Sequence, residues 1–295
     1  MIAHNRLCVA CLSKLESEKE NFLKNPADYP RSVIAFDFDG VISDSVHDSF
    51  VTALNAYLAF VPGNRLPLAS PIEPAGRIFQ YEQEEPGLFA QFLSLLPMGN
   101  RAEDYYVILR AVEQACVDKI SSQDDFESFR NAIDSGTREA FHTFFYRHRI
   151  ERQDADPEAW ARLLPAFPGI PETIRELSRR FILAIATAKD RRSVELQLKH
   201  YGLTDCFAPE NILDKDVSAS KRGHLVRLHE RLGTPYPDIH FIDDKVLHLL
   251  DVSGLGVTCY LSMWGYNSAR EHDIAREKGF TLLDLDRLGR IGDPG

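Results

Sequence analysis

The sequence predicts an α/β fold, in which an all-helical domain is inserted into a doubly wound, mainly parallel sheet. Two observations favour it. Short, continuous apolar runs alternate with helical stretches from residue 171 onwards, and one further run lies at 33–36. Between residues 46 and 165 no such run occurs, and helix-like stretches dominate. The 295 residues are enough for one large domain or two modest ones.

The strands are predicted from four runs that are apolar at nearly every position. Such a run suits a strand buried on both faces, as in a parallel sheet. Because helical stretches separate the later runs, we expect βαβ units that build a Rossmann-like sheet. The predicted strands are 33–36, 181–186, 239–242 and 256–261, and the predicted helices are 46–60, 89–96, 102–120, 124–149, 171–180, 191–201 and 221–232.

These elements predict three parts of the chain. Residues 1–30 are rich in Glu and Lys and end near two prolines, which indicates an N-terminal helical extension. Residues 31–45 and 166–295 are expected to form the α/β core. Residues 46–165 are expected to form the inserted helical domain.

Composition excludes several classes of protein. A net charge of −10 disfavours a nucleic-acid partner, because such proteins usually carry a basic stripe. No run reaches the ~18 to 20 apolar residues of a membrane span, so we expect no membrane partner and a cytoplasmic location. Five cysteines, an odd number, fit a reducing compartment. Cys8 and Cys11 are interpreted as ordinary helix cysteines, because a zinc site needs a further pair of ligands.

Three of the predicted strands deliver a polar residue at their carboxyl end. These residues are Asp37, Thr187 and Asp243. In doubly wound sheets ligands bind at the carboxyl ends of the strands. The sequence therefore predicts a binding site that contains all three side chains.

The segment Asp37-Phe38-Asp39-Gly40-Val41 has the residues for phosphoryl transfer. A carboxylate such as Asp37 can attack phosphorus and form an aspartyl-phosphate. Asp39 can then act as a general acid and base, and Gly40 permits a tight turn. A loop turn or a calcium loop are the alternatives. A calcium loop of the EF-hand type needs a Glu at its twelfth position, where Asp48 stands.

This motif, followed by Ser43-Asp44-Ser45, resembles the first signature of the haloacid dehalogenase (HAD) superfamily. The resemblance covers about residues 32–45 and 166–285. Within the superfamily, the chain is similar to the phosphoglycolate phosphatases and beta-phosphoglucomutases, which have a helical cap of the C1 class. It implies that Asp37 is the nucleophile and a Mg2+ ligand, and that Asp39 is the general acid and base and binds the metal through its backbone carbonyl.

The other signatures of that superfamily follow in order. Thr187 resembles the second, and Lys221 the third, although Arg222 stands where relatives often have proline and leaves two candidates for the cation. Asp243 and Asp244 resemble the fourth; we expect Asp244 to bind Mg2+ directly and Asp243 to assist. Adjacent buried carboxylates also make physical sense mainly beside a cation. The implied catalytic residues are Asp37, Asp39, Thr187 and Lys221, the phosphate-binding residues Phe38, Gly40, Thr187, Ala188 and Lys221, and the metal ligands Asp37, Asp39, Asp243 and Asp244.

The resemblance predicts a Mg2+-dependent phosphatase acting on a small phosphorylated metabolite. Two alternatives stay open: a phosphosugar mutase on the same core, and a non-catalytic binding or regulatory protein that retains the fold. Oligomeric state is not readable from the sequence. Candidate substrate contacts are Arg65, Arg77, Arg101 and Lys189, although each is more often a solvated charge. The ten histidines show no metal-binding spacing, and we assign them no role.

Overall fold

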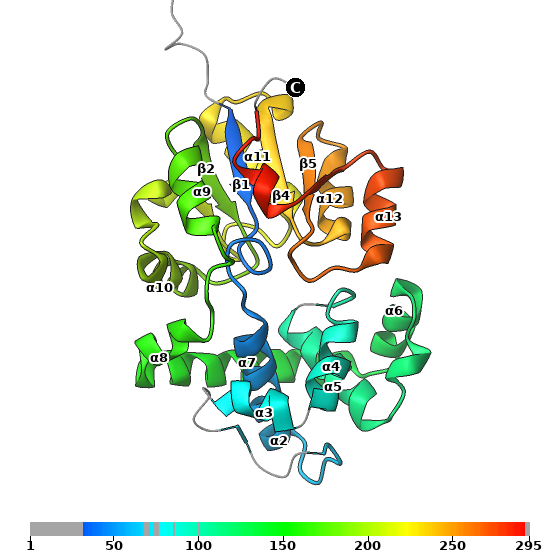
Figure 1. Cartoon of the computed structure of the whole chain (residues 1–295). Helices are drawn as coiled ribbons and strands as arrows, with labels where there is room; N and C mark the ends of the chain where they lie inside the picture. The colour runs from blue at the N-terminus through cyan, green and yellow to red at the C-terminus, as the bar shows by residue number, and fades with distance from the viewer. Residues whose placement is uncertain (1–31, 68–70, 73–76, 85, 100, 293–295) are drawn as a thin grey trace, which may run out of the picture. The chain divides into compact units, whose positions relative to one another are not determined.

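The computed structural model describes residues 32–67, 71–72, 77–84, 86–99 and 101–292 (Figure 1). The predicted extension 1–30, with its two cysteines, lies outside them. Within the described residues one six-stranded parallel sheet has the order β3-β2-β1-β4-β5-β6. Its strands are β1 Val33–Phe36, β2 Ile182–Ala186, β3 Ile212–Leu213, β4 Ile239–Asp243, β5 Thr258–Ser262 and β6 Thr281–Leu283.

The predicted doubly wound sheet is confirmed. All five strand pairings are parallel, and β1 lies between β2 and β4 at the centre, as Figure 1 shows. The four predicted strands agree with β1, β2, β4 and β5 to within two residues at each end. The sequence missed β3 and β6, because two or three residues are too few to form a recognisable apolar run.

Strand β1 is apolar at every position because both of its faces are covered. Ile34 and Phe36 face a core shared with α9 Ile170–Leu177, α10 Arg191–Tyr201 and α14 Leu285–Leu288. Val33 and Ala35 face a second core, shared with α11 Lys221–Leu232, α12 Val246–Ser253 and α13 Ala269–Glu277. Successive side chains point to opposite faces of a strand, so a strand that is covered on both faces needs an apolar residue at every position.

The described residues between 46 and 164 form helices and no strand. They have an apolar core of their own, to which every one of the larger helices contributes. None of the helices in the described part of the chain is both long and apolar enough to cross a membrane. The predicted domain boundaries stay a prediction. The helices are α2 Val46–Phe60, α3 Ile78–Glu84, α4 Pro86–Leu95, α5 Ala102–Glu113, α6 Gln123–Asn131, α7 Ser135–Ala155 and α8 Pro157–Arg162.

Two predicted helices of this insertion were wrong in extent. The helix predicted at 102–120 ends at Glu113, because Ala115 adopts a left-handed conformation with φ 50° and Cys116 N–H donates back to the Ala111 carbonyl oxygen. The helix predicted at 124–149 is two helices, α6 and α7. Asp134 begins the second one, since its side chain accepts the Thr137 N–H at 2.8 Å.

A buried carboxylate joins three helices of the insertion. Asp48 of α2 has no exposed surface and pairs with Arg149 of α7 at 2.8 Å and with Arg152 at 3.3 Å. Trp160 of α8 donates its indole N–H to Asp48 at 3.0 Å. Burial alone would raise the pKa of Asp48, but the two guanidinium groups outweigh it and hold the pKa below its ordinary value.

The substitution Asp48→Asn is expected to destabilise the fold by about 3–5 kcal/mol, because it leaves the buried Arg149 without its counter-charge. Urea unfolding measures the loss. The matched control is Asp154→Asn, whose partner Arg192 lies in an ion pair with both side chains more than half exposed. That change is expected to cost about 1 kcal/mol or less. Equal losses in the two variants would contradict the assignment of Asp48 as an anchor.

Candidate active site

The predicted strand-end residues meet at the carboxyl edge of the sheet. Asp37 directly follows β1, and its N–H donates to the Ile242 carbonyl oxygen of β4 at 2.8 Å. Thr187 directly follows β2, and its N–H donates to the Leu213 carbonyl oxygen of β3 at 2.9 Å. The order of the strands reverses at β1. This switch point is where open α/β sheets bind ligands.

Asp37 is buried and pairs with Lys221. The Lys221 ammonium lies 2.7 Å from Asp37 Oδ1, 3.3 Å from Asp243 Oδ2 and 2.7 Å from the Ala186 carbonyl oxygen. Burial raises the pKa of Asp37 to about 7, with Lys221 opposing the rise and Asp243 adding to it. Burial lowers the pKa of Lys221, but the two carboxylates outweigh it and the pKa lies above its ordinary value. The cation is therefore charged and in place beside Asp37.

Of the two candidates for this cation, Lys221 and not Arg222 lies at the site. The Arg222 guanidinium donates to the Asp251 carbonyl oxygen at 3.2 Å on the exposed side of α11. Ser220 caps α11 and accepts the Gly223 N–H at 3.1 Å, which places Lys221 at the first helical position. The helix start therefore selects which of the two adjacent cations faces inward.

Asp243 contacts His248, a residue that the sequence did not single out. His248 Nδ1 lies 3.0 and 3.1 Å from the two oxygens of Asp243. Burial would raise the pKa of Asp243, but His248 and Lys221 lower it well below the ordinary value. The prediction that the histidines have no role in the site missed this contact. The available signal was position, since His248 follows Asp244 by one helical turn at the start of α12.

Asp244 has a buried oxygen without a hydrogen-bond donor. Its Oδ2 accepts the Tyr266 N–H at 2.9 Å, whereas Oδ1 has no hydrogen-bond partner among the described residues. Burial and the neighbouring Asp243 raise the pKa of Asp244. A cation is the partner that such an oxygen lacks. Carboxylate oxygens are also the ligands that Mg2+ prefers, so Asp37 and Asp244 fit a divalent metal.

Glycines allow the backbone to approach Asp244. Gly40 has φ 82°, and a Cβ there would lie 2.5 Å from Asp244 Oδ2. A Cβ on Gly265 would lie 2.5 Å from the Gly40 carbonyl oxygen and 2.3 Å from Asp244 Cβ. Any larger residue at these positions would push the Asp37–Gly40 loop away from the acid.

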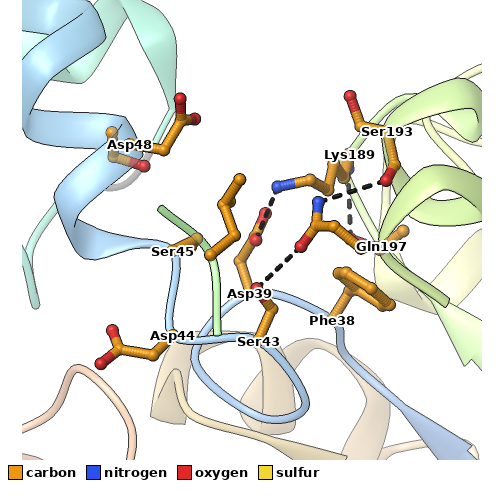
Figure 2. A network of polar contacts seen from close by, with 12 residues as sticks. Phe38, Asp39, Ser43, Asp44, Ser45, Asp48, Lys189, Ser193 and Gln197 are labelled. Atoms are coloured by element: carbon orange, nitrogen blue, oxygen red, sulfur yellow. Dashed lines mark hydrogen bonds and ion pairs between the residues drawn. The ribbon is translucent and has the colours of Figure 1, made fainter. Parts of the chain in front are cut away.

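Asp39 is a third exposed and lies on the same loop. Its Oδ1 accepts from Lys189 Nζ at 2.8 Å (Figure 2). Figure 2 also shows Ser43 of this loop donating to Gln197 of α10 at 2.8 Å. Gln197 in turn donates to the Ser193 carbonyl oxygen at 3.2 Å. These bonds fix the loop on α10 and place Asp39 beside Asp37.

The remaining predicted phosphate-binding residues lie close together with different exposures. Thr187 is buried, and its hydroxyl accepts the Lys189 N–H at 3.1 Å. Ala188 is exposed on the next turn of chain. The Phe38 side chain is buried in the core, so only its backbone could contact a ligand, and its N–H donates to Asp37 Oδ1 at 2.6 Å.

A cavity of about 530 Å3 lies above these residues, between the sheet edge and the helical insertion. Its walls include Asp37, Asp39, Thr187, Ala188 and Lys221. Volumes of this size are typical of small-molecule sites. The sequence missed several of its polar wall residues, which come from α7, α12 and the loop after β3: His142, Tyr146, Arg149, Lys215 and His248.

The four candidate substrate contacts separate into two pairs. Arg101 and Lys189 line the cavity. Arg65 and Arg77 are exposed and do not belong to its walls. The neighbouring aromatic residues of α7 also differ, because Phe145 is buried in the core of the insertion whereas Tyr146 lines the cavity.

Comparisons with known proteins agree with this geometry. A profile of the haloacid dehalogenase-like hydrolase family matches residues 32–247. Human magnesium-dependent phosphatase 1 is 30% identical over 106 residues, which are 34% of this chain and 56% of that protein. The chain thus matches about half the length of that relative.

Two crystal structures share the fold. A predicted phosphoglycolate phosphatase from Haemophilus somnus has 20% identity and a TM-score of 0.55, covering 90% of this chain and 99% of its own. A predicted phosphatase from Clostridium acetobutylicum has 15% identity and the same TM-score, 0.55, covering 88% of this chain and 97% of its own. Because the family profile spans well over half of its residues, the chain belongs to the haloacid dehalogenase-like hydrolase family.

The pH dependence of stability follows from His224 on α11. It is buried, and its Nε2 donates to the Asp214 carbonyl oxygen at 2.8 Å. Burial lowers the pKa of His224 from 6.5 to about 4, so the unfolded chain binds a proton that the folded chain excludes. The contribution of neutral His224 to the free energy of unfolding is complete above pH 6.5 and is lost as the pH falls to about 4.

We expect wild type to lose about 3 kcal/mol more unfolding free energy than His224→Gln between pH 7 and pH 4. Glutamine can keep the bond to Asp214 without titrating. Urea unfolding at several pH values measures the difference. Parallel pH profiles of the two proteins would contradict the assignment.

Proposed function

We propose that this hydrolase is a Mg2+-dependent phosphatase that cleaves a small phosphate monoester through an aspartyl-phosphate on Asp37. One observation carries the proposal: Asp37 lies at the wall of the cavity with Lys221 Nζ 2.7 Å from Oδ1. The described contacts from Phe38 N–H and Lys221 both use Oδ1, which leaves Oδ2 as the oxygen able to attack. The partial match to a human magnesium-dependent phosphatase supports the same reaction.

In the first half of the reaction Asp37 displaces the alcohol. An Asp37 oxygen forms a bond to phosphorus while the bond to the ester oxygen breaks, and Asp39 donates a proton to that oxygen. Lys221 offsets negative charge on the phosphoryl group, and the Thr187 hydroxyl and the Ala188 N–H hold its oxygens. Asp39 accepts the Lys189 ammonium in an ion pair, so it has to leave that pair and take up a proton from solvent before it can protonate the leaving group.

In the second half water takes the place of the alcohol. The water oxygen bonds to phosphorus, Asp39 takes a proton from it, and the bond from phosphorus to Asp37 breaks. Phosphate leaves and both carboxyl groups return to their first state. Asp37, Asp244 and the Asp39 carbonyl would hold Mg2+, with Asp243 assisting. When bound, the ion supplies positive charge that neutralises phosphoryl oxygens.

The substrate is proposed to be a small phosphorylated metabolite. A cavity of about 530 Å3 is of the size that holds such a molecule. The insertion covers the cavity, and its contacts with the core include Gln153 Nε2 donating to Ser193 Oγ at 2.7 Å. Lys245 Nζ also donates to the Leu96 carbonyl oxygen at 2.8 Å. Excluding water in this way strengthens the electrostatic interactions within the site.

The test is phosphate release from a panel of small phosphate monoesters, with and without Mg2+. Asp37→Asn is expected to lower turnover by at least about 10³-fold, because the amide cannot form the covalent intermediate. The control is Asp273→Asn on the exposed face of α13, which removes a carboxylate far from the cavity and is expected to leave turnover unchanged.

Each outcome decides between the candidate functions. Mg2+-dependent release that disappears only in Asp37→Asn establishes the phosphatase. Isomerisation of a phosphosugar without net release would identify a mutase on the same core. If neither reaction occurs with any ester, the proposal fails, and Mg2+ binding without activity would favour the non-catalytic binding protein.

A further inference from the structure

Arg149 brings a buried positive charge to the wall of the cavity from the helical insertion. It lies on α7, lines the cavity and has only 6% of its surface exposed. Arg101 and Glu103 are also charged wall residues of the insertion, but they have opposite signs and are exposed or half-buried. A guanidinium at a buried wall position is costly unless its charge is matched.

The contacts of Arg149 leave positive charge in excess. Its Nη2 lies 2.8 Å from Asp48 Oδ2, while Arg152 Nη1 lies 3.3 Å from the other oxygen of the same carboxylate. One negative charge therefore serves two guanidinium groups. Burial lowers the pKa of Arg149, but Asp48 outweighs burial and raises the pKa above its ordinary value. Arg149 is thus charged and only partly neutralised by the protein.

Arg149 and Tyr146 keep hydrogen-bond donors that no described residue accepts from. A guanidinium has five N–H donors, and the ion pair with Asp48 engages only Nη2. Nε of Arg149 is buried and has no hydrogen-bond partner among the described residues. The Tyr146 hydroxyl, three residues earlier on α7, makes no hydrogen bond within the same part of the chain. The Arg149 guanidinium carbon lies 5.9 Å from the centre of the Tyr146 ring, so the two side chains are neighbours.

The position of these donors relates them to the leaving group. The residues proposed to act on the phosphoryl group line the cavity from the core, whereas Arg149 and Tyr146 line it from the insertion. A phosphoryl group at the edge of the sheet leaves the remainder of the substrate in the space toward α7. Lys215 of the loop after β3 adds positive charge there, since its ammonium lies 4.4 Å from the centre of the Tyr146 ring.

Resting on the proposed phosphatase function, we propose that Arg149 and Tyr146 bind a second anionic group on the leaving group of the substrate, either a carboxylate or a second phosphate. A guanidinium binds both of these groups through paired N–H donors, and the tyrosine hydroxyl supplies one donor more. The anionic group matches the excess positive charge and accepts from the unused donors. The substrates are thus small phosphate monoesters that carry a second acid.

The test measures phosphate release by the full chain from two pairs of esters, each pair differing by one acidic group. The pairs are 3-phosphoglycerate with glycerol 3-phosphate, and fructose 1,6-bisphosphate with fructose 6-phosphate. Wild type is expected to cleave the more acidic member of at least one pair with a kcat/KM about 10-fold or more higher. The pair with the larger preference identifies the group as a carboxylate or a phosphate.

Two variants assign the preference to the proposed residues. Arg149→Lys keeps a positive charge beside Asp48 and removes the planar set of donors. It is expected to lower kcat/KM for the preferred ester by about 10-fold and for the other ester of the pair by less than about 2-fold. Tyr146→Phe removes only a hydroxyl and is expected to reduce the preference by about 3-fold or more. This second variant leaves the ion pair with Asp48 intact, so it remains informative if Arg149→Lys does not fold.

The matched control is Arg152→Lys, which changes the other guanidinium partner of Asp48 and does not belong to the cavity wall. This variant is expected to keep the wild-type preference between the two esters. Two results would overturn the inference. Wild type could cleave both members of each pair equally well, or neither Arg149→Lys nor Tyr146→Phe could reduce the preference. Equal losses for both esters in Arg149→Lys would mean that Arg149 only holds the insertion together.

The same measurements separate this inference from the proposed function. Mg2+-dependent release from other esters of the panel, with no preference in either pair, keeps the phosphatase and removes the site for a second anionic group. If wild type releases phosphate from no ester at all, the proposed function and this inference both fail.

Discussion

The ion pair between Lys221 and Asp37 is the interaction on which the site depends. It joins the end of β1 to the start of α11 at 2.7 Å, and the same ammonium reaches Asp243 at the end of β4. Three carboxylates of Asp37, Asp243 and Asp244 are buried around it. Without Lys221 their mutual repulsion would favour protonation, and Asp37 would lose its nucleophilic form. Even with Lys221, Oδ1 of Asp244 has no hydrogen-bond donor within the part of the chain that the structure describes, so the arrangement calls for a second cation.

The fold brings these charges together through two kinds of close approach. Parallel pairing of β1 with β4 places Asp37 beside the end of the neighbouring strand. Gly40 and Gly265 then let the loop after β1 lie directly on Asp244, where any Cβ would collide. The insertion closes the opposite side, and the buried Asp48 fixes α7, which carries Arg149 and Tyr146 into the cavity wall. The proposed phosphate site and the proposed metal site thus share one set of walls.

The sequence predicted the structure best where several consecutive residues are buried. Strands covered on both faces must be apolar throughout, and so β1, β2, β4 and β5 were recognisable. It was least successful in the insertion, where a single left-handed Ala115 and a capping Asp134 interrupt amphipathic patterns that continue across them. Breaks of this kind depend on one residue and leave little trace in hydrophobic periodicity.

The sequence by itself determined the class of fold, the family and the positions of the acidic and cationic residues, because these reside in local runs and short spacings. Only the tertiary structure decided which residues meet. Lys189 and Arg149 are far in the sequence from Asp39 and Asp48, the residues that they contact. It also decided that Lys221 rather than Arg222 faces the acids, since the cap of α11 sets the direction of each side chain. Contacts between distant segments arise from packing, which a linear pattern does not encode.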